Sequence, residues 1–171
     1  MRHHVSPRLF RGLIAALDES KLDVTVIAVQ PAARNEGLVD DLTLNVEALV
    51  ELRGTIADKQ AQLAALDLDV LVWLDVGLGI ESYFLAHGRY APVQAATWGH
   101  PVTTGIHEID FFLSMDVEVA DADNEYTETL VRFPGVPPFK YVAPDVTVKG
   151  MTRADFGLPD DGPLLLCPQY L

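Results

Sequence analysis

Seven stretches of the chain are rich in apolar and β-branched residues, and polar segments containing glycine or proline separate them. Most of these stretches are continuously apolar rather than alternating, and 22–29 in particular is nearly unbroken, as expected for a strand covered on both faces. The pattern predicts strands over residues 22–29, 47–52, 68–75, 93–98, 109–115, 128–133 and 162–169.

Several of the intervening segments have helical spacing of apolar residues. Ser6 and Pro7 form a preferred helix start with Ser6 as N-cap, and Thr55 is suited to cap a helix over 57–66. Further helices are expected near 36–44, over 81–90 and, as a single turn, over 152–156. Because strands alternate with helices, we predict an α/β fold with a doubly wound, mostly parallel, Rossmann-like sheet.

The composition is that of one folded, acidic domain. Of the 171 residues, 49% are hydrophobic and 22% are charged, so a substantial core can form. The formal net charge is −13, and such a surface repels a phosphate backbone, which argues against nucleic acid as a partner. A small anionic ligand is still compatible with a local site built from backbone N–H groups.

Compartment and membrane contact are predicted from the absence of two signals. The sequence has no run of about 20 apolar residues that would span a membrane, and its first ten residues lack the apolar region of a signal peptide. We therefore expect a cytoplasmic protein without membrane contact. The single cysteine, Cys167, cannot form an internal disulfide and is expected to be a buried, reduced thiol.

The segment between two predicted strands, GHPVTTGIHE (99–108), carries candidate chemistry. Ligands of parallel α/β sheets bind beyond the carboxyl ends of strands, so this segment and DVGLGI (75–80) are expected at that edge. Its glycines allow unusual backbone conformations, Thr103 and Thr104 offer hydroxyls, and the peptide N–H groups of 102–105 could form an anion-binding concavity. The alternative is a structural loop whose threonines cap the following segment.

Other chemistry has weaker support. DVGLGI contains G-x-G, but Ser82 stands where the dinucleotide fingerprint needs its third glycine, so NAD binding is disfavoured. His100 and His107 lie seven residues apart with no cysteine or carboxylate completing a ligand set, and we predict no metal site. The acidic run 116–128 lacks the glycine and ligand spacing of a calcium loop. No G-x-S-x-G string is present, which leaves nucleophilic catalysis without support.

Two histidines precede the first predicted helix. A histidine at a helix N-terminus tends to be neutral, because the helix dipole disfavours added positive charge. A neutral imidazole can accept a proton from a hydroxyl group. His3 and His4 are therefore candidate bases, with a solvated tail as the alternative.

Several strings of the sequence, in order, resemble the catalytic region of the O-GlcNAc transferase family. Residues 89–94 (RYAPVQ) resemble its R-x-A-P-V-Q string, and 99–105 (GHPVTTG) resemble its G-Y-P-G-T-S-G string. Downstream, 126–130 (YTETL) resemble Y-S-E-x-L, and 156–162 (FGLPDDG) resemble Y-G-L-P-E-D before a strand. The resemblance covers nearly the whole chain, and gapless spacing places His4 at the family's histidine, with His3 as the alternative.

The subgroup within that family stays open. The family includes protein O-GlcNAc transferases, plant fucosyl relatives and bacterial cytoplasmic N-glucosyltransferases of adhesins. The last group favours G-H-P-A-T-T, and GHPVTT is closer to that string than to G-Y-P-G-T-S. Val102 and Thr104 depart from the latter form. The donor sugar and the choice between O- and N-linkage are therefore left undecided.

The resemblance implies a GT-B enzyme, in which two Rossmann-like lobes enclose the active site. Residues 1–171 would be the N-terminal, acceptor-side lobe, and a C-terminal, nucleotide-binding lobe would lie outside this chain. The implied reaction moves GlcNAc or a hexose from a UDP-sugar to a protein Ser/Thr or Asn side chain, without a metal or other cofactor. We expect the isolated lobe to be inactive, because half a cleft cannot preorganise a transition state.

The resemblance also assigns roles and partners. His4 is the candidate catalytic residue on the acceptor side, and a UDP-sugar, an acceptor protein or peptide and the C-terminal lobe are the expected partners. Donor contacts, which would stabilise developing negative charge, are expected from Gly99, His100, Pro101, Thr103, Thr104 and Gly105. The alternative is a non-catalytic binding or interaction module derived from this lobe. A nicotinamide-dependent oxidoreductase rests on fold class alone.

Overall fold

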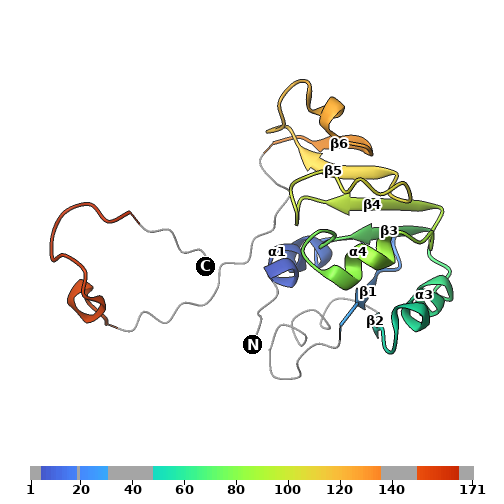
Figure 1. The fold of residues 1–171 in the computed structure, drawn as a ribbon, viewed down its shortest axis with the longest axis horizontal. Coiled ribbons are helices and arrows are strands. Elements are labelled where there is room, and N and C mark those ends of the chain that lie inside the picture. The colour runs from blue at the N-terminus through green and yellow to red at the C-terminus, as the bar shows by residue number, and fades with distance from the viewer. Residues whose placement is uncertain (1–4, 19, 31–47, 136–149, 166–171) are drawn as a thin grey trace.

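The computed structural model describes residues 5–18, 20–30, 48–135 and 150–165 (Figure 1). Strands and helices alternate along most of the chain, and η1 and η2 are short 3-10 helices. The elements are α1 (Val5–Ile14), β1 (Thr25–Ala28), β2 (Ala48–Glu51), α3 (Ile56–Ala64), β3 (Val70–Trp73), α4 (Ile80–Ala86), β4 (Val93–Thr97), β5 (Phe111–Met115), η1 (Ala122–Glu125), β6 (Thr129–Phe133) and η2 (Arg153–Phe156).

The strands form two sheets, and every strand pair is parallel. One sheet pairs β1 with β2, and the other has the order β3-β4-β5-β6. The α/β class with parallel, Rossmann-like pairing is therefore confirmed. All four strands of the larger sheet end at one edge, called here the carboxyl edge, and begin at the opposite one, the amino edge.

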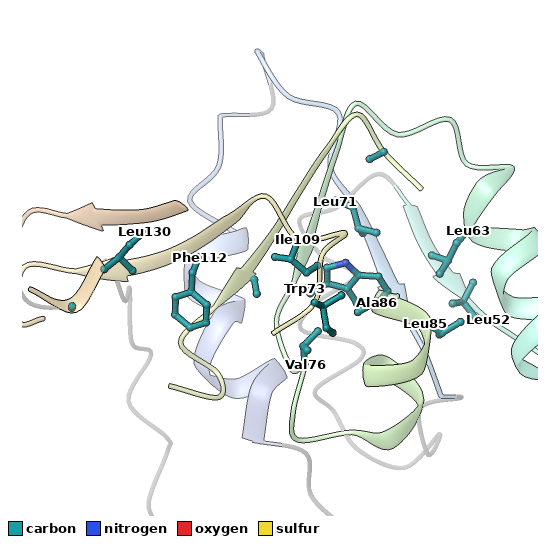
Figure 2. Packing of buried hydrophobic residues seen from close by; sticks show 14 residues of the cluster. Leu52, Leu63, Leu71, Trp73, Val76, Leu85, Ala86, Ile109, Phe112 and Leu130 are labelled. Atoms are coloured by element: carbon teal, nitrogen blue, oxygen red, sulfur yellow. The ribbon is translucent and has the colours of Figure 1, made fainter. Parts of the chain in front are cut away.

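One buried row of side chains crosses all four strands of the larger sheet. Trp73 pairs in register with Ala96, Ala96 with Phe112, and Phe112 with Leu130, and each is buried. Leu63 of α3 and two residues of α4 join the same core. Figure 2 shows this cluster running from Phe112 and Leu130 on one side to Leu52 and Leu63 on the other.

The two faces of β3 differ. Leu71 and Trp73 are buried in the core, whereas Val70 is 54% exposed and Val72 is 40% exposed. The apolar 68–75 run therefore forms a strand with one buried face and one partly exposed face among the described residues. A continuous apolar run shows that both faces of a strand can be buried. Whether another element packs against each face depends on the rest of the fold.

A buried lysine fixes α4 beside the end of β1. Lys59 of α3 is buried, and its Nζ donates to the Val29 carbonyl oxygen at 2.7 Å. The same Nζ lies 2.5 Å from Oε2 of Glu81 in the first turn of α4. Charge pairing plus a carbonyl contact lets the ammonium group stay buried. The start of α4, and with it the loop after β3, is thereby held in place.

Several predicted elements are confirmed with shifted ends. Thr55 caps α3 in a capping box with Asp58, as its sequence position indicates. The first helix begins at Val5, one residue before the expected cap, and ends at Ile14. The expected helix at 36–44 lies outside the described residues. No strand is formed by 163–165, and 166–169 lie outside the described part.

The length and polarity of the helices also bear on membrane contact. Of the helices in the described ranges, none is both long enough and apolar enough to cross a bilayer.

Candidate functional site

The loops after β3 and β4 meet at the carboxyl edge through two glycines. A Cβ on Gly99 would lie 2.0 Å from the carbonyl oxygen of Leu74, so only glycine allows this approach of the two backbones. Gly77 has φ +95°, and a Cβ there would lie 2.3 Å from Cδ2 of His100. The imidazole of His100 is thus packed directly on the turn that precedes α4.

The first helix is anchored beside the same turn. Phe10 of α1 is fully buried, and its ring centroid lies 5.2 Å from that of Trp98, the residue before Gly99. Such a tilted pair adds to the burial energy of both rings. α1 begins directly after His4 in the sequence, but His3 and His4 lie outside the described residues. The structure therefore leaves the role predicted for His4 as a prediction.

The second half of the segment binds a carboxylate of the chain itself. The Thr103 hydroxyl donates to Glu128 Oε2 at 2.8 Å, and the Thr104 amide donates to Glu128 Oε1 at 2.8 Å. The Thr104 hydroxyl also donates to Oε1. Glu128 is only 6% exposed. Of the peptide N–H groups of 102–105 that were expected to bind an anion, the Thr104 amide binds this internal carboxylate, whereas the Val102 amide donates to the His100 carbonyl.

These contacts place the threonines at the amino edge. Glu128 directly precedes Thr129, the first residue of β6, and Thr103 also accepts a hydrogen bond from the Thr127 amide at 3.1 Å. The expectation that the whole 99–108 segment lies at the carboxyl edge is therefore wrong for its second half. The physical reason is that β4 and β5 are parallel, so the connection between them, the β4–β5 crossover, must return to the amino edge before β5 can begin.

The threonines also cap the segment that follows them, which is the structural role that the sequence analysis left open. The Ile106 amide donates to the Thr104 hydroxyl at 3.2 Å, which caps the start of the segment that follows. Gly105 has φ +66°, so its predicted unusual backbone conformation is confirmed. Gly99 does not have a positive φ, and its requirement comes instead from the close contact with Leu74.

Opposing effects set the pKa of the Glu128 carboxyl. Burial raises this pKa, because it disfavours the charged form. Hydrogen bonds from Thr104 and Thr103 favour the carboxylate and outweigh burial, so the pKa lies below its usual value. Glu128 is thus ionised at neutral pH and accepts three hydrogen bonds from neutral donors.

A second polar network at the amino edge explains another string of the resemblance. Arg89 pairs with both carboxylate oxygens of Asp110 at 2.6 and 3.1 Å, and the Gln94 amide donates to Asp110 Oδ2 at 2.8 Å. The Gln94 side chain is fully buried and donates to the Glu108 carbonyl at 2.8 Å. The Arg89 guanidinium, followed by the Gln94 amide, lowers the pKa of Asp110. These residues tie the start of β4 to the start of β5.

A hollow of about 460 Å³ also lies at the amino edge, away from the contact between Gly77 and His100. Its carboxylate, on Asp110, is already paired with Arg89. The lining residues are Gly105, Ile106, His107, Ile109, Asp110, Thr127 and Thr129. Within the described ranges, no group of three or more His, Cys, Asp or Glu side chains is arranged to hold a metal ion.

Comparison with known proteins gives one kind of match. No family model matches the sequence, and no curated protein matches it. Among solved structures, a mutant of the O-GlcNAc transferase of Thermobaculum terrenum matches with a TM-score of 0.68 and 27% identity over 77% of this chain. The chain has the fold of a glycosyltransferase lobe. It covers 25% of the matched chain, and so spans about a quarter of its length.

One residue of the site has no role in the sequence analysis. Glu128 stands in the string that resembles Y-S-E-x-L, but nothing local connects it with threonines 24 and 25 positions earlier. No periodicity joins positions so far apart along a chain. Glu128 could have been predicted from the two neighbouring strings of the resemblance, 99–105 and 126–130. The first contains two threonines, which are hydrogen-bond donors, and the second contains a single acidic residue, which is an acceptor.

Proposed function

We propose that residues 1–171 are the N-terminal, acceptor-side lobe of a cytoplasmic protein glycosyltransferase of the GT-B kind. The reaction moves GlcNAc or a hexose from a UDP-sugar to a Ser/Thr or Asn side chain of a protein. The observation that carries the proposal is the contact of Gly99 and His100 with the loop after β3, at the carboxyl edge of a lobe similar to an O-GlcNAc transferase. Ligands of such sheets bind at this edge.

The two halves of the 99–105 segment take different parts in this proposal. Gly99, His100 and Pro101 lie at or directly after the carboxyl-edge contact and approach the donor. Thr103, Thr104 and Gly105 serve the donor indirectly, by holding the segment at the amino edge. Backbone N–H groups near Gly99 would stabilise negative charge that develops on the leaving diphosphate.

The remaining roles follow from the resemblance. His4 would orient or deprotonate the acceptor group from the start of α1. We expect no metal or other cofactor, with the UDP-sugar as donor substrate. A C-terminal lobe would complete the cleft, and the isolated chain would be inactive, because a transition state needs groups from both walls held in place.

The test uses the complete gene product rather than this lobe alone. UDP release is measured with UDP-GlcNAc or UDP-glucose and an acceptor peptide, for the natural enzyme and for His100→Ala. We expect His100→Ala to lower turnover by at least about tenfold, equivalent to about 1.4 kcal/mol. His107→Ala is the matched control, since that side chain is 98% exposed and lies in the same segment. No UDP release with any sugar donor would refute the proposal.

The second candidate function is a binding module that does not turn over substrate, and it would use the same docking face as an enzyme lobe. The outward face of α4 is apolar, with Ile80 72% exposed and Phe84 53% exposed. Tyr83 packs edge-on against both Phe84 and His87 on this face. A helix that is apolar on both faces is normally covered. Because the chain spans a quarter of the similar enzyme, the occupant we propose is the C-terminal lobe.

Association of the two separately expressed lobes tests this docking face, and absence of UDP release from the associated pair would favour the binding module. Phe84→Ser is expected to weaken binding of the C-terminal lobe by at least about tenfold, because an apolar contact of about 1.4 kcal/mol or more is removed. Val117→Ser is the matched control, since Val117 is similarly exposed but lies in the loop after β5. Equal affinities of the two variants would exclude the α4 face as the docking surface.

A further inference from the structure

The carboxylate of Glu128, in the connection between β5 and β6, accepts three hydrogen bonds from one short stretch of the connection between β4 and β5. Its donors are the Thr103 hydroxyl, the Thr104 amide and the Thr104 hydroxyl. Both carboxylate oxygens are used, and the residue is buried. A buried carboxylate with several directed donors is a rigid link, because breaking it would leave a charge desolvated and unpaired.

The link is close enough to the carboxyl-edge turn to determine its position. Thr104 lies four positions after His100, and Pro101 restricts the backbone between them. The Val102 amide donates to the His100 carbonyl at 2.9 Å, which closes a tight turn at this point. Fixing Thr104 therefore limits where the His100 ring can lie above Gly77.

We propose that Glu128 is the positioning residue of the 99–108 segment, an internal anion that fixes Thr103 and Thr104 at the amino edge and thereby holds Gly99 and His100 at the carboxyl edge. The inference deepens the proposed function and rests on it for its catalytic consequence. It also assigns the anion-binding capacity of Thr103 and Thr104 to the chain itself rather than to the donor's diphosphate. Glu128 touches no reacting atom in this arrangement.

Hydrogen exchange of backbone amides in this chain tests the positioning role without reference to catalysis. In Glu128→Gln, the amides of Thr104 and Ile106 are expected to exchange at least about tenfold faster, because their hydrogen bonds depend directly or indirectly on the carboxylate. Amides within β4 and β5 are expected to keep their protection. Unchanged exchange at Thr104 and Ile106 would overturn the proposal.

A matched control lies in the same crossover as Glu128. Glu118 accepts hydrogen bonds from the hydroxyls of Ser114 at 2.6 Å and Tyr126 at 2.9 Å, so it is also a hydrogen-bonded carboxylate. Glu118→Gln is expected to leave exchange at Thr104 and Ile106 unchanged. If Glu118→Gln accelerated exchange there as much as Glu128→Gln does, a general loosening of the crossover would explain the result, and the proposal would fail.

Chemical rescue separates a carboxylate anchor from a side chain that only fills space. Glu128→Ala leaves room for a small carboxylate, so formate or acetate is expected to restore slow exchange at Thr104, whereas chloride at equal ionic strength is not. Failure of both carboxylates to restore protection, in a variant that keeps protected strands, would overturn the anchor role. If Glu128→Ala does not fold, the isosteric Glu128→Gln decides the matter by its exchange pattern.

The catalytic consequence is measured in the complete enzyme. Glu128→Gln is expected to raise KM for the UDP-sugar and lower kcat/KM at least about tenfold, and Glu128→Asp is expected to recover part of the loss. Normal kinetics in Glu128→Gln despite fast exchange at Thr104 would overturn the link to the donor site. A natural enzyme without transferase activity, combined with the expected exchange and rescue results, would refute the proposed function and leave the positioning role intact.

Discussion

The two edges of the larger sheet are built by different physical means. At the amino edge, carboxylates accept hydrogen bonds from directed donors, as Asp110 does from the Arg89 guanidinium and Glu128 from the Thr104 backbone amide. At the carboxyl edge, Gly99 and Gly77 bring backbone and ring atoms into direct contact. Hydrogen-bonded networks tolerate small changes of volume but not loss of a partner, whereas close-packed glycines tolerate no added atom.

The strings that resemble the O-GlcNAc transferase family are divided between the two edges of the larger sheet. R-x-A-P-V-Q supplies Arg89 and Gln94, and Y-S-E-x-L supplies Glu128, so both strings serve the scaffold at the amino edge. Gly99 and His100, from the third string, reach the carboxyl edge. A string that resembles one of an enzyme family can therefore serve the scaffold of the lobe.

Gly99→Ala should produce the largest effect and tests the close packing of the carboxyl edge. The new Cβ would lie 2.0 Å from a backbone oxygen, which cannot move aside as a flexible side chain can. We expect a loss of about 3 kcal/mol in the free energy of unfolding, measured by urea denaturation. Gly150→Ala is the control, because a Cβ there meets nothing within 4 Å, and its effect should stay within about 0.5 kcal/mol. Equal stabilities would contradict the difference between the edges.

Gln94→Leu addresses the network at the amino edge. The substitution keeps the side-chain volume but leaves the Glu108 carbonyl without the donor that now lies 2.8 Å away. The free energy of unfolding should fall by about 2 kcal/mol, the cost of unsatisfied buried polar groups. Urea denaturation measures it, and a stability equal to that of the natural chain would show that apolar packing alone suffices at this edge.

Gly77→Ala distinguishes the effect of displacing the His100 ring from the effect on the free energy of unfolding. Its φ of +95° disfavours alanine, but the clashing atom belongs to the His100 ring, which can rotate away. The expected loss is therefore only about 1–2 kcal/mol, while displacement of the ring should lower turnover of the complete enzyme by at least about tenfold. Thermal melting and UDP release measure the two quantities. Full activity would remove His100 from the donor site.

The pH dependence of stability should give the smallest effect, because it isolates one carboxyl group. The folded-state pKa of Glu128 is below the ordinary 4.5. Its contribution is therefore complete above about 4.5 and is lost as pH falls through the folded value. Tyr126 interacts electrostatically with Glu128, but burial and the hydrogen bond to Glu118 raise its pKa to about 12, so it stays neutral.

The measurement is the difference in the free energy of unfolding between the natural chain and Glu128→Gln, from neutral pH down through the folded-state pKa of Glu128. The pKa of Asp110 is also lowered, mainly by Arg89, so both proteins should lose stability in acid. Only the natural chain should lose the additional contribution from Glu128. Parallel curves for the two proteins would show that the carboxylate charge adds nothing to the network.

The sequence by itself determined the fold class and much of the local structure. The alternation of apolar runs and helical spacing predicted the parallel α/β order, and Thr55 predicted the start of α3. These features depend on residues a few positions apart, where backbone geometry fixes which side chains meet. For the same reason Gly105, whose φ is a local property, was identified correctly.

Only the tertiary structure decided which residues of the 99–105 segment lie at each edge. Its threonines meet Glu128 across 24 and 25 positions, and His100 meets Gly77 across 23. Whether a crossover lays a residue at the carboxyl or the amino edge depends on the path by which it returns over the sheet. That path is set by packing against distant elements, so a local pattern could show that the segment carries donors but not which anion they bind.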